Sequence, residues 1–344
     1  MGGIDRLNDA IFDAVGRRPQ LGFQCVRLVT RGKRGLLSAQ GVFASALLRF
    51  CMAAWRGDVD LLHIHLSNGG SSYRKAVLGK FARALRIPYV VHLHGIQFRE
   101  FWASTNPLLQ VELERLHEGS ARIVVLGKYW AEVILERLPD LAARIVVLPN
   151  ATALTPQVCR SKREQGKVQI TFLGKLGTRK GVPDLIRALS RLANLPDWSA
   201  TIAGDGEIAE AKAQAQQLGI AARVEIPGWL DVAAREKLLA RTDILVLPSY
   251  AENLPMVIVE AFACGLAVIA TPVGAIPEVI VDGDTGLLVQ PGDDAALASA
   301  IERLVKEPGL RSLLGEGARR MYRERFEFDR YIGQLAEIWR QATN

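Results

Sequence analysis

Short apolar runs rich in β-branched residues alternate with amphipathic stretches along nearly all of the 344 residues. The runs have the length of strands, and the stretches between them have the period of helices. Such alternation predicts an α/β protein with parallel sheets. The expected strands are Gln24–Thr30, Val59–Leu66, Tyr89–Leu93, Arg122–Leu126, Ile145–Leu148, Val168–Leu173, Ala200–Ala203, Val224–Ile226, Ile244–Leu247, Ala267–Ala270 and Gly286–Val289.

A polar segment without a clear period, ATALTPQVCRSKREQGK, divides this pattern and is typical of a linker. We therefore expect two doubly wound domains, residues 1–155 and 156–327, with a cleft between them, and a final helix over residues 328–344. The chain opens on Gly2-Gly3, a turn that normally follows a central strand. The first domain thus lacks its first strand, or the natural chain begins upstream and is then more stable and more active.

Charge is distributed unevenly: residues 1–155 carry a net charge of +8, and residues 156–344 a net charge of −1. The basic half suggests an anionic partner, either nucleic acid or an anionic membrane surface, and an ordinary solvated surface is the alternative. No recognisable nucleic-acid motif is present, so we expect no nucleic-acid partner. No apolar run reaches the length of a membrane span, and no signal peptide is evident. The four widely spaced cysteines are typical of reduced thiols in the cytoplasm.

The strongest local signal is SYAENLPMVIVEAFACGLAVIATPVGAIPEVI, residues 249–280. Asn253 is predicted to cap a helix that begins near Pro255, and the free N–H groups at its start form an anion site. Glu252 before the helix and Glu260 on it could each bind the hydroxyls of a different sugar, on either side of a diphosphate. The alternative is a solvated Glu252 that favours the helix dipole.

Lys175 and Lys180 lie in a glycine-rich loop, residues 174–181, directly after a predicted strand. The spacing is not that of a nucleoside-triphosphatase P-loop, because no GxxxxGK[ST] can be placed there. Two cations without a magnesium motif suit the diphosphate of a nucleotide-sugar. Surface lysines in a loop are the alternative.

Four histidines alternate on two predicted strands: His63 with His65, and His92 with His94. Each pair therefore shares one face of its strand. Zinc would need three or four ligands at close range, and no cysteine or acid motif accompanies these histidines. We expect no metal site, and packing within the strands for three of the four.

A second anion site is predicted in the basic half, where NGGSSYRK places Ser71, Ser72, Arg74 and Lys75 at a helix start. The segment HGIQFREFW follows with aromatic residues beside an arginine. Together they would suit a lipid-linked pyrophosphate acceptor at the inner membrane face. A capped helix and a buried aromatic cluster are the alternative.

In their order along the chain, these motifs resemble the retaining glycosyltransferases of family 4, which have the GT-B fold of two Rossmann-like domains facing a cleft. The SSYRK and HLHGIQF segments look like those of bacterial exopolysaccharide and capsule glycosyltransferases. The resemblance covers nearly the whole chain. It rests on Gly2-Gly3-Ile4, HLHG at 92–95, LPN at 148–150, FLGKLGTRKG at 172–181, AGDGE at 203–207, the E-x7-E region and DGDTGLLVQPGD at 282–293.

The resemblance implies transfer of a sugar from a UDP- or GDP-sugar to a lipid-linked glycan acceptor in bacterial surface polysaccharide synthesis. Configuration at the anomeric carbon is retained, and neither a metal nor another cofactor is required. The enzyme is expected in the cytoplasm, peripheral on the inner face of the cell membrane. The final helix, residues 328–344, is expected to cross back to the N-terminal, acceptor-binding domain, while residues 156–327 bind the nucleotide-sugar.

The same resemblance implies residue roles. Glu252 matches the acid that holds donor-sugar hydroxyls, and Glu260 the acid that binds the ribose. Lys180 matches the lysine on the donor diphosphate, and Lys175 stands where the family usually has arginine. His94 matches the histidine beside the donor sugar, so His94, Glu252 and Lys180 are the expected catalytic residues. The remaining donor-binding residues are Gly2, Gly3, Asn253 and Leu254.

Two other functions stay open. A GT-B sugar-nucleotide epimerase would need catalytic acids in the cleft in place of the E-x7-E and lysine set. A catalytically impaired GT-B partner of a true transferase is favoured by the absent first strand and opposed by the presence of Glu252, Glu260, Lys180 and His94.

Overall fold

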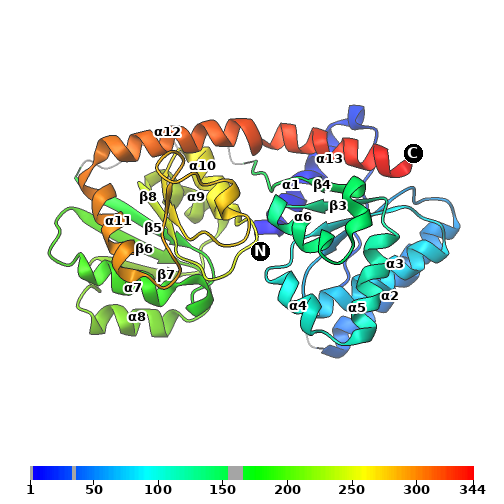
Figure 1. The fold of residues 1–344 in the computed structure, drawn as a ribbon, viewed down its shortest axis with the longest axis horizontal. Coiled ribbons are helices and arrows are strands. Elements are labelled where there is room, and N and C mark those ends of the chain that lie inside the picture. Colours follow the sequence, from blue (N-terminus) through cyan, green and yellow to red (C-terminus); the bar gives the residue numbers. More distant parts are fainter. Residues whose placement is uncertain (1–2, 33–35, 154–165) are drawn as a thin grey trace. The chain divides into compact units, whose positions relative to one another are not determined.

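The computed structural model describes residues 3–32, 36–153 and 166–344 and divides the chain into two compact units. We call them the four-stranded unit and the six-stranded unit, after their sheets. The four-stranded unit comprises Asn8–Pro149 and Asp329–Asn344, and the six-stranded unit comprises Met1–Leu7 and Asn150–Phe328. Every strand pairing described in either sheet is parallel, which confirms the α/β class (Figure 1).

The six-stranded sheet has the order β10-β9-β8-β5-β6-β7. This is the doubly wound order of dinucleotide-binding folds, in which the winding direction reverses between the two central strands, here β5 and β8. The buried positions of both central strands hold apolar residues, apart from one threonine in β5. Strands that are covered on both faces typically have such a composition. The strands are β5 Val168–Leu173, β6 Trp198–Ala203, β7 Val224–Gly228, β8 Ile244–Leu247, β9 Ala267–Ala270 and β10 Leu287–Leu288.

Two groups of helices pack against this sheet: α7 contacts α8 and α11, whereas α10 contacts α9 and α12. Helix α10 is buried along its whole length, which explains its uniformly apolar sequence apart from Glu260. The helices are α7 Val182–Arg191, α8 Ile208–Gln217, α9 Val232–Arg241, α10 Met256–Cys264, α11 Asp294–Lys306 and α12 Pro308–Arg325, with short 3-10 helices at Thr178–Lys180 and Ile276–Glu278.

The four-stranded sheet has the order β1-β2-β3-β4. Its strands are β1 Leu62–Leu66, β2 Tyr89–Leu93, β3 Arg122–Val125 and β4 Ile145–Val147. The residues of helix α1 are divided between the two units: those up to Leu7 belong to the six-stranded unit, and those from Asn8 onward belong to the four-stranded unit. The helices are α1 Gly3–Arg17, α2 Leu36–Trp55, α3 Gly70–Ala84, α4 Phe98–Ser104, α5 Pro107–Glu118, α6 Lys128–Leu135 and α13 Phe328–Thr343, with 3-10 helices at Pro19–Leu21 and Pro139–Arg144.

The expected strand Gln24–Thr30 is wrong, because these residues are irregular in the structure. Val26 is 85% exposed and Val29 is 55% exposed. A β-prone sequence forms a strand only when a neighbouring strand supplies hydrogen bonds. Among the described residues, β1 pairs with β2 alone, so its other edge has no strand beside it. That a strand precedes Gly2 stays a prediction.

Helix α13 packs within the four-stranded unit. Tyr331, Leu335, Ile338 and Trp339 recur at helical spacing, and all four are buried. The indole Nε1–H of Trp339 donates a hydrogen bond to Nδ1 of His63 on β1, over 2.8 Å. The end of the chain therefore covers the sheet face that carries His63.

The cysteines depart partly from expectation. Cys25 and Cys51 are free thiols, but Cys264 at the end of α10 is disulfide-bonded. The expectation of reduced thiols is wrong for Cys264, because folding brings together cysteines that are distant in sequence, which spacing alone does not reveal.

Candidate functional site

The central candidate site lies at the switch point of the six-stranded sheet. Strands β5 and β8 are hydrogen-bonded neighbours, and each ends in one of the loops singled out from the sequence. Ligands in open α/β sheets bind beyond the carboxyl ends of strands at this point, because the connecting loops diverge there. The glycine-rich loop 174–181 follows β5, and the loop 248–255 follows β8.

Close backbone contact joins the two loops. Gly181 has φ +67°, and a β-carbon on it would lie 2.0 Å from the carbonyl oxygen of Pro248. Only glycine fits such a position without strain. Arg179 adds a second link, because its Nη1 donates to the carbonyl oxygen of Ala251 over 2.9 Å.

This contact places the Lys180 ammonium against the Glu252 carboxylate, and the two form an ion pair. Glu252 is 4% exposed, and its Oε1 also accepts a hydrogen bond from Ser249 Oγ over 2.8 Å. A buried carboxylate is stable only with such partners. The structure therefore brings together two predicted site residues that are 72 positions apart in sequence.

Glu260, 3% exposed on α10, contacts two arginines. Arg6 Nη2 lies 3.1 Å from Oε1, and Arg235 of α9 pairs with Oε2. Burial, reinforced by the positive charge of Arg6, lowers the pKa of Arg235 to about 9. The carboxylate of Glu236 also acts on both arginines, so the cluster joins two guanidinium groups to two acids. Neither arginine belongs to a motif, so the sequence had no signal for them.

The start of α10 differs from expectation. The helix begins at Met256 with Pro255 as its N-cap, so the prediction that Asn253 caps it is wrong. Two residues of loop separate Asn253 from the first helical residue, and its side chain makes no hydrogen bond to the N–H groups of the first turn. Asn253 is buried, and neither Oδ1 nor Nδ2 has a partner among the described residues. A buried amide with unsatisfied atoms is a ready ligand for a bound polar group.

The other predicted donor residues lie nearby or outside the described chain. Leu254 is buried, and its carbonyl oxygen accepts from Asn150 Nδ2 over 3.0 Å. Lys175 is exposed in the same loop as Lys180, but no ion pair of it is found in the described part of the chain. Gly3 is the first residue of α1, and Gly2 lies outside the described residues.

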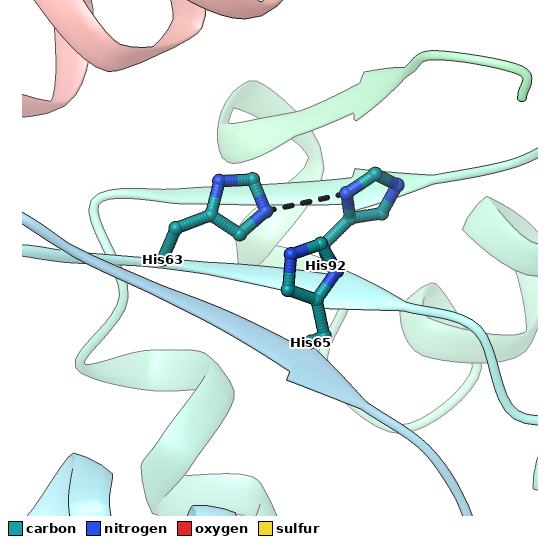
Figure 2. A group of neighbouring side chains, drawn as sticks. All are labelled: His63, His65 and His92. Atoms are coloured by element: carbon teal, nitrogen blue, oxygen red, sulfur yellow. Dashed lines mark hydrogen bonds between the residues drawn. The ribbon is translucent and has the colours of Figure 1, made fainter. Parts of the chain in front are cut away.

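A second candidate site occupies the four-stranded unit. Strands β1 and β2 pair in parallel with His65 opposite His92, so both histidine pairs gather on one face. Figure 2 shows the rings of His63, His65 and His92 directed toward one another. His94 Nε2 lies 2.9 Å from His65 Nδ1, and His94 Nδ1 is buried without a partner among the described residues. Burial lowers the pKa of His94 well below its ordinary value, so this ring is neutral.

The predicted acceptor residues begin α3. Ser72 is fully buried, and its hydroxyl donates to the carbonyl oxygen of Ser67 over 2.8 Å, so it serves the helix start. Lys75 Nζ donates to Thr30 Oγ1 over 3.0 Å. Burial and the charge of Arg74 lower the pKa of Lys75 to about 8. Ser71 is half-buried beside Ser72.

The aromatic residues expected at the acceptor do not face outward. Phe98 and Trp102 are fully buried, and Trp102 stacks on His117 with ring centroids 5.1 Å apart. The alternative of a buried aromatic cluster therefore holds for these two. In the part of the chain that is described, no helix has the length and apolarity needed to cross a bilayer.

The two units and the paired acids at the switch point define a class: the chain has the GT-B fold, as predicted. Residues 159–321 match the family model "Glycosyl transferases group 1", and residues 12–151 match the "Glycosyl transferase 4-like domain". The chain is therefore a glycosyltransferase of the family-4 type, and the prediction of an enzyme of this class is confirmed.

Three comparisons illustrate the likeness. N-acetyl-alpha-D-glucosaminyl L-malate synthase of Bacillus anthracis is 29% identical over 295 residues, which cover 83% of this chain and 76% of that one. Glycogen synthase of Mycobacterium tuberculosis is 30% identical over 179 residues, 52% of this chain. The chain spans only 43% of that relative's length. The crystal structure of Anabaena HepE with UDP superposes with a TM-score of 0.74 at 22% identity, over 86% of this chain and 82% of that one.

Proposed function

We propose that the chain is a retaining transferase that moves a sugar from a UDP- or GDP-sugar to a lipid-linked glycan acceptor. The observation that carries this proposal is the switch-point geometry of the six-stranded unit. There Glu252 and Glu260 are both buried and both held by cations. Buried acids beside an anion-binding helix start suit a ligand that combines hydroxyls with phosphates.

Each donor group has a matching partner. Glu260 accepts hydrogen bonds from the ribose hydroxyls, and Glu252 from hydroxyls of the transferred sugar. Lys180 and Lys175 neutralise the diphosphate. The guanidinium groups of Arg6 and Arg235 hold the Glu260 carboxylate in place for the ribose. The Lys180–Glu252 ion pair then opens when the donor binds, since each partner gains a new one. Asn253 and the backbone of Leu254 complete the proposed donor-binding site.

Chemistry proceeds without a metal. The bond between the anomeric carbon and the leaving phosphate oxygen breaks, and the acceptor oxygen bonds to that carbon on the same face. The acceptor hydroxyl proton passes to the leaving phosphate. Lys180 and the α10 start stabilise charge on the leaving oxygen, where it is largest in the transition state. His94 stabilises the positive charge of the oxocarbenium-like sugar through its carbonyl or ring.

The basic half supports the proposed acceptor and location. Exposed apolar residues on α2, with Arg49 and Arg56 beside them, suit an anionic membrane surface. Arg74 and Lys75 suit the phosphate of a lipid-linked acceptor. The proposed setting is bacterial surface polysaccharide synthesis on the cytoplasmic face of the membrane, with no nucleic-acid partner.

The proposal is tested with purified protein that carries no polyhistidine tag. A panel of UDP- and GDP-sugars is screened by thermal shift with EDTA present, and the best donor is then assayed for hydrolysis and transfer. A ligand at 100 times its Kd adds about 2.7 kcal/mol of stability, which shifts the melting temperature by several degrees. The anomeric proton of the product reports retention. If no nucleotide-sugar shifts melting and none is hydrolysed, the proposal is wrong.

One observation favours a second candidate, the catalytically impaired partner. Arginines engage both oxygens of Glu260, so this acid already has two strong partners within the chain. An impaired partner would bind membrane yet neither bind nucleoside diphosphate nor hydrolyse any donor. The same screen with EDTA therefore separates the two candidates.

A further inference from the structure

The four histidines of β1 and β2 form a cluster that the proposed transfer uses only in part. We call His63, His65, His92 and His94 the histidine ladder. Neighbouring rings stack or tilt against one another, with centroids 4.6 Å apart for His63 and His65 and 4.1 Å apart for His92 and His94. The transfer mechanism above assigns a role only to His94. The other three rings are therefore open to a separate function.

Three of these rings bring their nitrogens close together, as a shared metal ion requires, and the sequence could not test this proximity. One ring nitrogen from each of His63, His65 and His92 lies within 4.8 Å of the other two (Figure 2). His63 Nε2 and His92 Nδ1 are 3.3 Å apart. Zinc binds imidazole nitrogen at roughly 2.0–2.1 Å, so two ligands at tetrahedral angles stand about 3.3 Å apart. This spacing fits a shared ion once the proton that now lies between the two nitrogens is displaced.

The ring nitrogens of the ladder are in a state that suits a metal ion. His92 is fully buried, and its Nε2, which has no partner among the described residues, keeps the ring proton when Nδ1 binds the ion. Burial, with the neighbouring rings, lowers the pKa of both His63 and His92 well below the ordinary value. The rings are thus neutral, which is the protonation state that binds metals.

We propose that His63, His65 and His92 bind one divalent transition-metal ion through their ring nitrogens, with water in the remaining position. Three imidazoles without a carboxylate suit zinc, cobalt, nickel or copper and do not suit magnesium or calcium. The site goes beyond the proposed sugar transfer, which needs no metal.

The surroundings of the ladder determine how the ion is held. If His65 binds through Nε2, its Nδ1–H donates to His94 Nε2, 2.9 Å away. A metal-bound histidine commonly donates its second N–H in this way, which fixes the ring. Burial, reinforced by the positive charge of Lys75, lowers the pKa of His65 to about 4, and the same charge opposes a bound cation. Lys75 therefore weakens the site without occupying it.

Trp339 competes with the metal. Its indole N–H donates to His63 Nδ1, so that nitrogen carries a lone pair and His63 Nε2 carries the proton. A metal on Nε2 requires the proton to move to Nδ1, and the indole must then turn away. Metal binding and this hydrogen bond on α13 exclude each other. Removing the indole donor should therefore strengthen binding.

The test is a cobalt titration of tag-free, EDTA-treated full-length chain, followed by visible absorption and equilibrium dialysis. We expect one Co²⁺ per chain, a band typical of tetrahedral coordination, and its displacement by Zn²⁺. His65→Gln and His92→Gln should each weaken binding at least tenfold. His117→Gln, which removes a buried histidine of the same unit outside the ladder, should bind as the parent does.

Trp339→Phe keeps all four histidines and should bind Co²⁺ several-fold more tightly than the parent. This variant keeps the test decisive even where a ladder variant fails to fold, which circular dichroism will report. The proposal is overturned if the parent chain binds no Co²⁺ at one equivalent. It is equally overturned if Trp339→Phe binds no more tightly, or if His117→Gln loses as much affinity as the ladder variants.

Discussion

Each of the two acids at the switch point has cationic partners, and these partners differ. Glu252 pairs with a lysine from a loop, whereas Glu260 pairs with arginines from two helices. Lysine presents a point charge on a flexible stem, and arginine presents a planar fork. The Glu252 pair is therefore the easier to open, and the Glu260 cluster is the more rigid.

Replacing each acid should separate nucleotide binding from turnover. We expect Glu260→Ala to weaken binding of the free nucleoside diphosphate at least tenfold, because hydrogen bonds to a charged acceptor contribute about 1.5–3 kcal/mol. Glu252→Ala should chiefly lower kcat, since we propose that Glu252 holds hydroxyls of the transferred sugar. Calorimetry and donor turnover measure both effects.

Glu225→Ala is the matched control for this pair. Glu225 is an acid of β7 in the same unit, and it pairs with Arg241 over 3.5 Å at the exposed surface. Its removal should leave nucleotide affinity within about twofold. Equal losses of affinity in the Glu252 and Glu260 variants would contradict the separate roles.

At the scale of elements, the site depends on the loops 174–181 and 248–255, whose backbones lie so close that no side chain fits between them at Gly181. Gly181→Ala should destabilise the chain, because its β-carbon would lie 2.0 Å from the Pro248 carbonyl oxygen. Gly219→Ala is the control, with a similar φ of +71° and no atom within 4 Å. A left-handed alanine alone costs about 1–2 kcal/mol.

We expect Gly181→Ala to lose at least about 2 kcal/mol more than Gly219→Ala, because the backbone of one loop must move. Urea denaturation measures the difference. Donor binding should also weaken, since Lys180 moves with its neighbour. Equal stabilities of the two variants would show that the loops can separate freely.

Helix α2 has an exposed apolar stripe, Leu48, Met52 and Trp55, of which Trp55 is 85% exposed. Large exposed apolar side chains beside arginines favour an anionic bilayer interface. The double variant Leu48→Ser, Trp55→Ser should reduce binding to phosphatidylglycerol vesicles at least tenfold. Leu313→Ser, an exposed leucine on α12, should not.

Vesicle co-sedimentation measures this binding, with neutral phosphatidylcholine vesicles as the second control. Charge attraction requires binding to fall on the neutral vesicles and at high salt. If the stripe variant sediments as the parent does, α2 is not the membrane surface.

At the scale of the whole molecule, buried neutral histidines make stability depend on pH. Burial lowers the pKa of His117 to about 4, against an ordinary value of 6.5. Below pH 6.5 the unfolded chain takes up a proton that the folded chain refuses until about pH 4. The free energy of unfolding therefore falls as pH falls, by about 1.4 kcal/mol per pH unit for this one residue.

Replacing His117 measures how much this residue contributes to the pH dependence of the free energy of unfolding. The unfolding free energy of His117→Gln, followed by tryptophan fluorescence, should fall less steeply between pH 6.5 and 4.5 than that of the parent. Carboxylates titrate alike in both proteins and cancel in the comparison. Parallel slopes would mean that His117 does not resist protonation in the folded chain.

Much of the fold follows from the sequence, because apolar runs bounded by turns leave few alternatives. Strands Tyr89–Leu93, Val168–Leu173, Ile244–Leu247 and Ala267–Ala270 have the predicted bounds. The exception, Gln24–Thr30, has strand composition but no neighbouring strand to pair with. Residue propensity alone can favour a strand, but the strand forms only where a neighbouring strand supplies the backbone hydrogen bonds.

The sequence by itself determined the α/β class and the two sheets, and it singled out Glu252 and Glu260 as candidates, since these inferences rest on patterns along the chain. Tertiary structure alone decided which charges meet. The Lys180–Glu252 pair, the arginines on Glu260 and the convergence of three histidines join residues tens to hundreds of positions apart. Electrostatic and metal-binding interactions act through space over a few ångströms, and only the folded chain sets those distances.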